Sequence, residues 1–206
     1  SSTEPGARLG DVLDLFAALH DPAFAGDRAR AETEAAGAIH DGLAKVKAIN
    51  DDRLLRQYRA LVDATLRTNA FIASGEQALA FKLDSAKVPG LPAPLPWREV
   101  FVYSPRVEGI HLRAGPVARG GLRWSDRRDD FRTEILGLMK AQRVKNAVIV
   151  PTGAKGGFVG KKLPDPAVDR EGWLTQGIGC YRTFISGLLD LTDNLSITHA
   201  DGGALT

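Results

Sequence analysis

Three groups of basic residues between positions 119 and 162 are the best suited to chemistry in this sequence of 206 residues. They are Arg-Gly-Gly-Leu-Arg at 119–123, the pair Lys140 and Lys145, and Thr-Gly-Ala-Lys-Gly-Gly at 152–157. A guanidinium group binds a carboxylate through two parallel hydrogen bonds, so Arg119 and Arg123 are candidates for holding an acidic substrate. Gly120 and Gly121 between them would let a ligand come close to the backbone.

Lys155 in the third group is the candidate for acid–base chemistry. The apolar segment 147–150 predicts a short buried strand, and 152–157 then predicts a loop at its carboxyl end, where α/β proteins bind ligands. Gly153 and Gly156 on either side of Lys155 would let backbone amides approach a ligand. A lysine that is partly desolvated and close to other cations can act as a base near neutral pH.

Two nucleotide-binding motifs are excluded by their spacing. A phosphate-binding loop requires Gly-x-x-x-x-Gly-Lys followed by Ser or Thr, and Gly160-Lys161-Lys162 lacks both the hydroxyl residue and the first glycine. In addition, no Gly-x-Gly-x-x-Gly follows a predicted strand. The sequence therefore contains no recognisable dinucleotide-binding fingerprint.

The elements that must position these groups are predicted to be helices followed by strands. The Ala-rich segment 29–47 predicts one helix, and Asp51 and Asp52 are expected to cap a second helix. Four prolines within 89–96 predict a stiff connector. Segments 99–103 and 107–112 then predict two strands, joined by a turn at Ser-Pro-Arg.

Two later helices are expected to pack on these strands. One should start near Asp129 or Asp130, and a last one should span 173–191. Five residues at heptad-like spacing are expected to form the apolar face of the last helix: Leu174, Ile178, Tyr181, Ile185 and Leu188.

The predicted fold class is α/β, with N-terminal helices followed by a mixed sheet packed with helices. Four regions are expected along the chain: a helical region at 1–88, the connector at 89–97, an α/β region at 98–195 and a tail of uncertain origin at 196–206.

The uneven charge distribution is typical of a solvated basic face, and it is also compatible with an anionic partner. Residues 98–162 carry a local charge of +8, whereas the remainder of the chain carries −6. The basic part would attract anions, and the acidic flanks make general nucleic-acid binding less favourable. A basic nucleic-acid-binding domain is the plainest alternative, but aromatic residues are not interleaved with the basic ones as single-strand binding requires.

Composition excludes several other classes of protein. With 44% hydrophobic and 25% charged residues the chain is typical of a soluble globular protein, and neither a membrane span nor a secretory signal is predicted. The single cysteine, Cys180, is expected to be a buried small hydrophobe, and it makes an intramolecular disulfide impossible, which favours a cytoplasmic location. His111 is expected to be a packed or surface residue, and the histidines lack metal-ligand spacing, so no metal site is predicted.

The residues between 61 and 194 resemble the large-subunit NAD-specific glutamate dehydrogenases. The resemblance rests on Val-Ala-Arg-Gly-Gly-Leu-Arg-Trp-Ser-Asp-Arg at 117–127, Gly-Leu-Met-Lys-Ala-Gln at 137–142, Lys-Asn-Ala-Val-Ile-Val-Pro at 145–151 and Gly-Ala-Lys-Gly-Gly-Phe at 153–158. Phe-Val-Tyr-Ser-Pro-Arg-Val-Glu-Gly at 101–109 and Arg-Thr-Asn at 67–69 look like the same family.

The resemblance implies roles for three residues. It identifies Lys155 as the catalytic lysine, which activates the water that attacks the iminoglutarate intermediate. It implies that Lys145 contacts the α-carboxylate of the substrate and that Arg119, a lysine in the small hexameric enzymes, also contributes to substrate binding. The family's catalytic aspartate has no clear counterpart here, although Asp201 in Ala-Asp-Gly-Gly bears a faint likeness to its segment.

The resemblance also implies a function for the whole enzyme: glutamate and NAD would give 2-oxoglutarate, ammonia and NADH. This chain would supply the substrate-binding part, and NAD would be bound by a domain that the chain does not contain. Apart from the resemblance, Trp124 is expected to pack in the core or at a hinge, although its place beside Arg123 would also let it shape the floor of the pocket. The full-length enzyme is expected to be a homo-oligomer, and the isolated chain is expected to be inactive. The alternative is a non-catalytic module that binds dicarboxylates or serves assembly.

Overall fold

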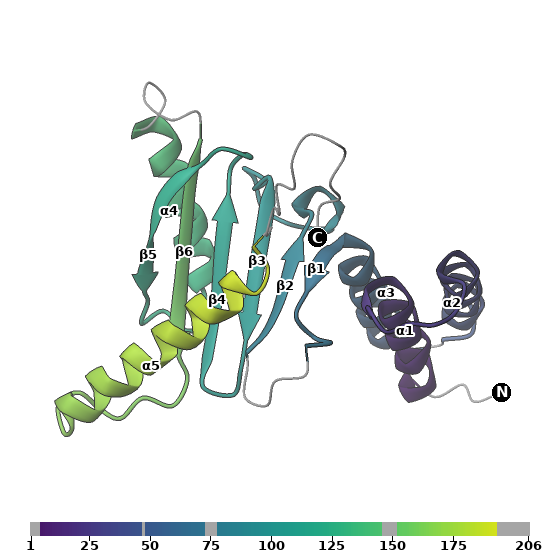
Figure 1. Ribbon diagram of the computed structural model, residues 1–206, viewed down its shortest axis with the longest axis horizontal. Helices are drawn as coiled ribbons and strands as arrows, with labels where there is room; N and C mark the ends of the chain where they lie inside the picture. Colours follow the sequence, from purple (N-terminus) through teal and green to yellow (C-terminus); the bar gives the residue numbers. More distant parts are fainter. Residues whose placement is uncertain (1–4, 47, 73–77, 146–151, 193–206) are drawn as a thin grey trace, which may run out of the picture.

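The computed structural model describes residues 5–46, 48–72, 78–145 and 152–192 of the chain. Within these residues a six-stranded sheet forms the centre of the molecule, with one helix on each of its faces and three N-terminal helices beside its β1 edge (Figure 1). None of the helices in the described part is both long and apolar enough to cross a membrane.

Three helices precede the sheet: α1 (Pro5–His20), α2 (Arg28–Leu43) and α3 (Ile49–Ala64). Val12 and Leu15 of α1 and Ile39 of α2 are buried against one another. The side chain of Asp27 caps α2 by accepting from the amide of Arg30. The helix that Asp51 and Asp52 were expected to cap is confirmed, but its N-cap is Ala48. Asp51 and Asp52 lie in its first turn, where their negative charge interacts favourably with the positive end of the helix dipole.

The strands are β1 (Thr65–Thr68), β2 (Leu79–Leu83), β3 (Arg98–Tyr103), β4 (Val107–Arg113), β5 (Arg119–Trp124) and β6 (Gly153–Gly160). Their order in the sheet is β1-β2-β3-β4-β6-β5. Every neighbouring pair is antiparallel except β5 and β6, which run parallel. The predicted mixed sheet and the predicted hairpin of β3 and β4 are confirmed.

The two remaining long helices cover opposite faces of the sheet, called here the α4 face and the α5 face. On one side α4 (Phe131–Lys145) buries Ile135 and Met139 against Ile110 and Leu112 of β4. On the other side α5 (Arg170–Leu189) buries Phe184 against Val102, Val107 and Phe158. A short 3-10 helix, η1 (Ser85–Lys87), follows β2.

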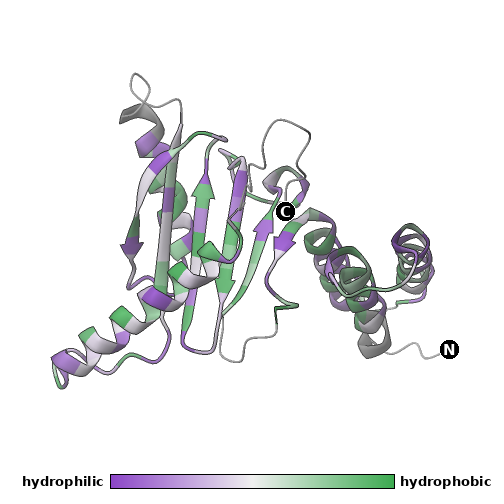
Figure 2. Ribbon diagram, viewed as in Figure 1, coloured by the Kyte–Doolittle hydropathy of each residue, from purple (hydrophilic) through white to green (hydrophobic). Residues whose placement is uncertain are grey.

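Helix α5 faces the sheet with three small residues and one large residue, Phe184. The buried residues of α5 are Gly177, Cys180, Phe184 and Gly187, whereas Leu174, Ile178 and Tyr181 are exposed. The predicted apolar face of this helix was therefore wrong, because the helix lies so close to the strands that a Cβ on Gly187 would be 2.9 Å from Val102. Figure 2 accordingly shows hydrophobic and hydrophilic residues mixed along α5.

The Pro-rich connector lies between two strands of the same sheet. It separates β2 from β3, and these two strands pair along their length from Leu79 opposite Tyr103 to Leu83 opposite Glu99. The region 1–88 therefore contains strands β1 and β2 and the short helix η1 in addition to α1, α2 and α3. The division of the chain into four regions stays a prediction.

Two glycine-rich segments that were predicted to be loops are strands. Residues 119–123 lie in β5, and 153–157 lie in β6, between β4 and β5. Glycine weakens an isolated strand, so its abundance favoured a loop. Here the glycines are required by close packing, which only the tertiary structure reveals. The strand predicted at 147–150 lies outside the described residues.

Candidate functional site

Lys155 is the third residue of β6 and points to the α4 face. Successive side chains of a strand alternate between the two faces. Gly157 and Val159, which follow Lys155 by two and four residues on β6, identify its face. A Cβ on Gly157 would overlap Ile135 of α4, and Val159 is buried among the residues that pack on α4. Lys155 shares their parity and is half-buried.

Gly121 lies directly beside Lys155. The two residues are paired in the parallel ladder of β5 and β6. A Cβ built on Gly121 would lie 3.6 Å from Nζ of Lys155. Apart from Gly121 and its chain neighbours, no other atom of the described residues would lie within 4 Å of that Cβ. The missing side chain of Gly121 therefore leaves an open position next to the ammonium group.

The other glycines of the two strands allow close packing. A Cβ on Gly120 would overlap the carbonyl oxygen of Ala154, and a Cβ on Gly156 would meet Leu122 and His111. The ladder pairs β6 with a strand on each side, so its amides are engaged in the sheet. The expectation that Gly153 and Gly156 free backbone amides for a ligand was therefore wrong.

Arg119 and Arg123 share the face of Gly121 and Lys155, because they alternate with Gly120 and Leu122 along β5. Arg119 is exposed and is paired with Gly153, two residues before Lys155. The structure thus brings Arg119 and Lys155 to the same part of the α4 face.

The guanidinium group of Arg123 is held by α4. Its Nε lies 2.5 Å from Oε1 of Glu134, whose side chain is only 10% exposed. The hydroxyl of Ser125 donates to Oε2 of the same carboxylate at 2.5 Å. Glu134 thus fixes the end of β5 against α4, and Arg123 already has a carboxylate partner.

Glu134 and Ser125 were not predicted to be part of the site. The available signal was local: Glu134 lies in the first turn of the helix predicted to start near Asp130, where an acidic residue is favourable. That signal does not name a partner on another element, and only the packing of α4 on β5 supplies one.

Lys145 ends α4, and its side chain lies outside the described residues. Figure 1 shows that α4 ends at the end of the sheet where β6 begins, and β5 begins at the same end because it is parallel to β6. The backbone positions of Lys145, Arg119 and Lys155 are thus at one end of the molecule. Lys140 is exposed on α4. Asp201 and the tail lie outside the described residues.

Trp124 does not lie beneath Lys155. It stacks on Trp173 of α5, with ring centroids 4.2 Å apart, and its ring fills the space above Gly177. Trp124 therefore packs against the core on the α5 face, which confirms the packing role expected for it, whereas the expectation that it also shapes the floor of the Lys155 site was wrong. Cys180 is buried as predicted, and burial raises the pKa of its thiol.

Metal chemistry finds no support among the described side chains. No group of three or more His, Cys, Asp and Glu side chains in this part of the chain is arranged to hold a metal ion. The groups assembled on the α4 face are instead the exposed guanidinium of Arg119, the half-buried ammonium of Lys155 and the open position at Gly121 of β5. Such an arrangement can bind a carboxylate and can transfer a proton.

The chain matches known proteins over most of its length. Residues 38–201 match the family described as bacterial NAD-glutamate dehydrogenase, catalytic domain. The chain is 54% identical over 202 residues to the NAD-specific glutamate dehydrogenase of Mycobacterium tuberculosis, covering 93% of this chain and 12% of that protein. It is 56% identical over 189 residues to the enzyme of the same name from Halomonas elongata, covering 90% of this chain and 12% of that protein.

A third relative is the NAD-specific glutamate dehydrogenase of Pseudomonas aeruginosa, which is 58% identical over 162 residues, 77% of this chain and 10% of that protein. The chain thus spans about one eighth of the length of the curated relatives it matches. The match of the family model to most of the chain and these identities show that the chain belongs to the bacterial NAD-glutamate dehydrogenase family, within the catalytic domain.

Proposed function

We propose that this chain is the substrate-binding part of an NAD-dependent glutamate dehydrogenase, which oxidatively deaminates L-glutamate to 2-oxoglutarate and ammonia. The observation that carries the proposal is the ammonium group of Lys155 beside the open position at Gly121, on the face where Arg119 is exposed. The names of the relatives support the reaction.

Each basic residue has a distinct task in this proposal. Arg119 binds a carboxylate of the substrate through its guanidinium fork, and Lys145 binds the α-carboxylate from the end of α4. The backbone of Gly120 and Gly121 forms the wall that the substrate contacts. Arg123, held by Glu134, adds positive charge and keeps β5 in place.

Lys155 is the proposed acid–base group. In the amine form it accepts a proton from the water that attacks the iminium carbon of the oxidised substrate, which gives a carbinolamine. The resulting ammonium donates this proton to the amino group of the carbinolamine, and ammonia leaves as the Lys155 amine takes up the hydroxyl proton and passes it to solvent. The open position beside Nζ gives that water and the substrate room to reach the amine. A positioned general base of this kind contributes on the order of 10²–10⁴ in rate.

NAD is the expected cofactor, and it supplies the hydride acceptor when bound. The described residues do not fit a dinucleotide: β5 and β6 are the only parallel pair in the described sheet, and α5 follows β6 without a glycine-rich turn. We propose that NAD is bound by residues outside those that the structure describes. A homo-oligomeric enzyme and a cytoplasmic location stay predictions.

The alternative proposal is a non-catalytic module that binds glutamate or 2-oxoglutarate. It uses the same arginine and lysine residues but requires no proton transfer. Activity of the native-length protein that carries this chain separates the two, because a module of this kind would bind 2-oxoglutarate without reducing NAD.

The test is the substitution Lys155→Gln in the native-length protein, with Lys162→Gln as the matched control, since Lys162 is exposed just beyond the same strand. We expect kcat for glutamate oxidation to fall by about 10²–10⁴ in Lys155→Gln and to be unchanged in Lys162→Gln. Calorimetry with 2-oxoglutarate checks that binding survives. A Lys155→Gln enzyme with unchanged kcat would overturn the proposed role.

A further inference from the structure

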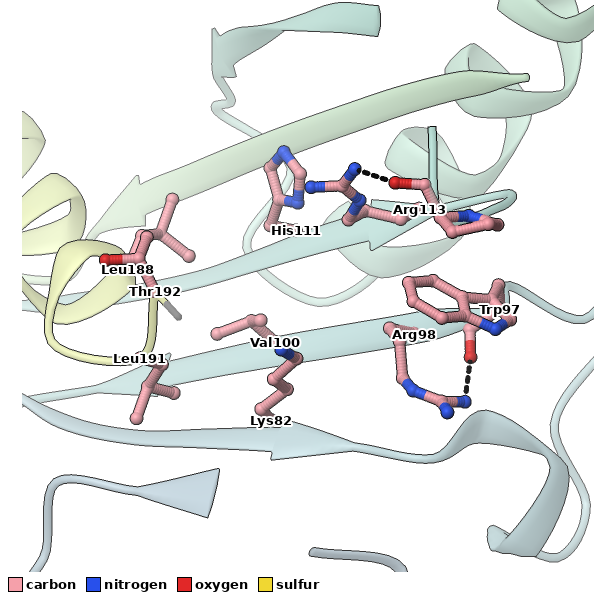
Figure 3. A pocket seen from close by; sticks show the side chains of 10 residues that line it. Lys82, Trp97, Arg98, Val100, His111, Arg113, Leu188, Leu191 and Thr192 are labelled. Atoms are coloured by element: carbon pink, nitrogen blue, oxygen red, sulfur yellow. Dashed lines mark hydrogen bonds between the residues drawn. The ribbon is translucent and has the colours of Figure 1, made fainter. Parts of the chain in front are cut away.

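A second cationic site lies on the opposite face of the sheet from Lys155. A cavity of about 350 Å³ opens between the end of α5 and strands β2, β3 and β4 (Figure 3). Ten residues line it: Lys82, Trp97, Arg98, Val100, His111, Arg113, Pro116, Leu188, Leu191 and Thr192. Three of these carry a full positive charge at neutral pH, and no acidic residue is among them.

Arg113 is the residue of this cavity whose hydrogen bonds are incomplete among the described residues. One of its terminal nitrogens donates to the carbonyl oxygen of Pro116 at 2.8 Å. Its Nε is buried and has no hydrogen-bond partner among the described residues. A buried guanidinium donor without a partner costs free energy, so a native site of this kind is expected to receive an acceptor.

His111 lies beside Arg113 on β4, two residues earlier on the same face, and Figure 3 shows the imidazole next to the guanidinium. Burial, with a smaller contribution from the charge of Arg113, lowers the pKa of His111 to about 4. The imidazole is therefore neutral at neutral pH and presents one N–H donor and one acceptor. The lowered pKa agrees with the position of His111 next to the positive charge of Arg113, in a cavity without an acidic residue among the described residues that line it.

The opposite wall combines a paired arginine with apolar side chains. Arg98 forms an ion pair with Asp84 at 3.1 Å, and its guanidinium lies over the ring of Trp97 at 4.4 Å from the centroid. Part of its charge is thus already balanced, whereas Arg113 has no such ion pair among the described residues. Val100, Leu188 and Leu191 supply apolar surface.

We infer that this cavity binds a small organic anion, whose carboxylate or phosphate group accepts hydrogen bonds from Arg113 and His111 and whose apolar or aromatic part packs on Trp97 and Leu188. The volume lies at the lower end of the range of small-molecule sites, which begins at about 300 Å³. The site lies on the α5 face, so the binding is independent of the proposed chemistry at Lys155.

The cavity nevertheless lies next to the strand that carries Lys155. His111 is paired with Gly156 in the ladder of β4 and β6, and a Cβ on Gly156 would be 2.8 Å from Cδ2 of His111. Gly156 directly follows Lys155. An anion bound to His111 and Arg113 would therefore lie against the strand that carries the proposed catalytic lysine.

Calorimetric titration of the native-length protein with benzoate and with phenyl phosphate tests the inference, because the two probes share an aromatic ring and differ in the anionic group. Benzyl alcohol is the neutral control. We expect at least one anion to bind and the alcohol not to bind. The stronger of the two anions identifies the ligand as a carboxylate or a phosphate.

Variants locate the binding site. Arg113→Gln should weaken anion binding at least tenfold, whereas Lys155→Gln and the exposed control Arg53→Gln should leave it unchanged. If Arg113→Gln unfolds, Arg113→Lys keeps the charge but loses Nε, and it should weaken binding at least threefold. Absence of binding by both anions, equal binding by the alcohol, or loss of binding in Lys155→Gln instead of the Arg113 variants would each overturn the inference.

Discussion

Lys155 and Gly121 lie side by side across the parallel pair of strands β5 and β6, with the lysine ammonium 3.6 Å from the position that a Cβ of Gly121 would occupy. The absence of a side chain on Gly121 is therefore part of the candidate site. By contrast, Gly120 is required for a different reason, since its Cβ would overlap the carbonyl oxygen of Ala154. Adjacent glycines in one strand thus have separate functions, one at the site and one in the fold.

The substitutions Gly121→Ala and Gly120→Ala should separate these functions. Gly121→Ala places a methyl group at ordinary contact distance from Lys155, so the fold should persist, while kcat/KM for glutamate should fall about tenfold, or about 1.4 kcal/mol. Gly120→Ala forces β5 away from β6 and should destabilise the protein by about 1–3 kcal/mol. Thermal unfolding and steady-state kinetics measure both. Equal effects of the two substitutions on stability would contradict this distinction.

The ion pair of Arg132 and Glu99 should hold α4 on the sheet. Arg132 binds both oxygens of Glu99, at 3.0 Å from Nε and 2.6 Å from Nη2, and the Glu99 side chain is only 8% exposed. Glu99→Ala leaves the guanidinium without its partner and should cost about 3 kcal/mol. The free energy of unfolding from urea titration provides the measurement.

The matched control for Glu99→Ala is Glu34→Ala, which removes an exposed helical ion pair with Arg30. Water solvates both groups of that pair, so stability should not change measurably. If the two substitutions had the same effect on stability, the buried pair would not be what joins α4 to β3.

His111 should make stability depend on pH in the acidic range. Its pKa is lowered from 6.5 to about 4 in the folded chain, chiefly by burial. Between these values the unfolded chain binds a proton that the folded chain does not, so stability falls as pH decreases from 6.5 to 4 and is unaffected above 6.5. The loss from this residue is about 3 kcal/mol at most.

The measurement is the melting temperature at several pH values for the native protein and for His111→Gln. The difference between the two should change with pH below about 6.5 and should be constant above it. A histidine with an ordinary pKa would give no such difference, and an unchanged pH profile in His111→Gln would refute the burial effect.

The chain by itself should not reduce NAD in the presence of glutamate. Hydride transfer requires a dinucleotide domain that closes over the substrate and excludes water from Lys155. The absorbance of reduced nicotinamide measures turnover, and circular dichroism establishes that the tested chain is folded. Detectable reduction of NAD by the folded chain would contradict the prediction that hydride transfer requires a further domain.

Helix α4, the hairpin of β3 and β4 and the family of the chain could be predicted from the sequence alone. The spacing of apolar residues gave α4 from near Asp130, the alternation in 99–103 and 107–112 gave the hairpin of β3 and β4, and the segments around Lys155 gave the family. These features are local: helical periodicity, strand alternation and a dense set of identical residues are each contained in a short stretch of chain.

The tertiary structure decided what those residues contact. The glycines at 120, 156 and 157 favoured loops, but they lie in strands because Ala154, His111 and Ile135 approach them from other elements. The same close packing turned the small residues of α5 and Phe184 toward the sheet and left Leu174, Ile178 and Tyr181 exposed. Distances between residues far apart in the chain set these outcomes, and no local pattern encodes such distances.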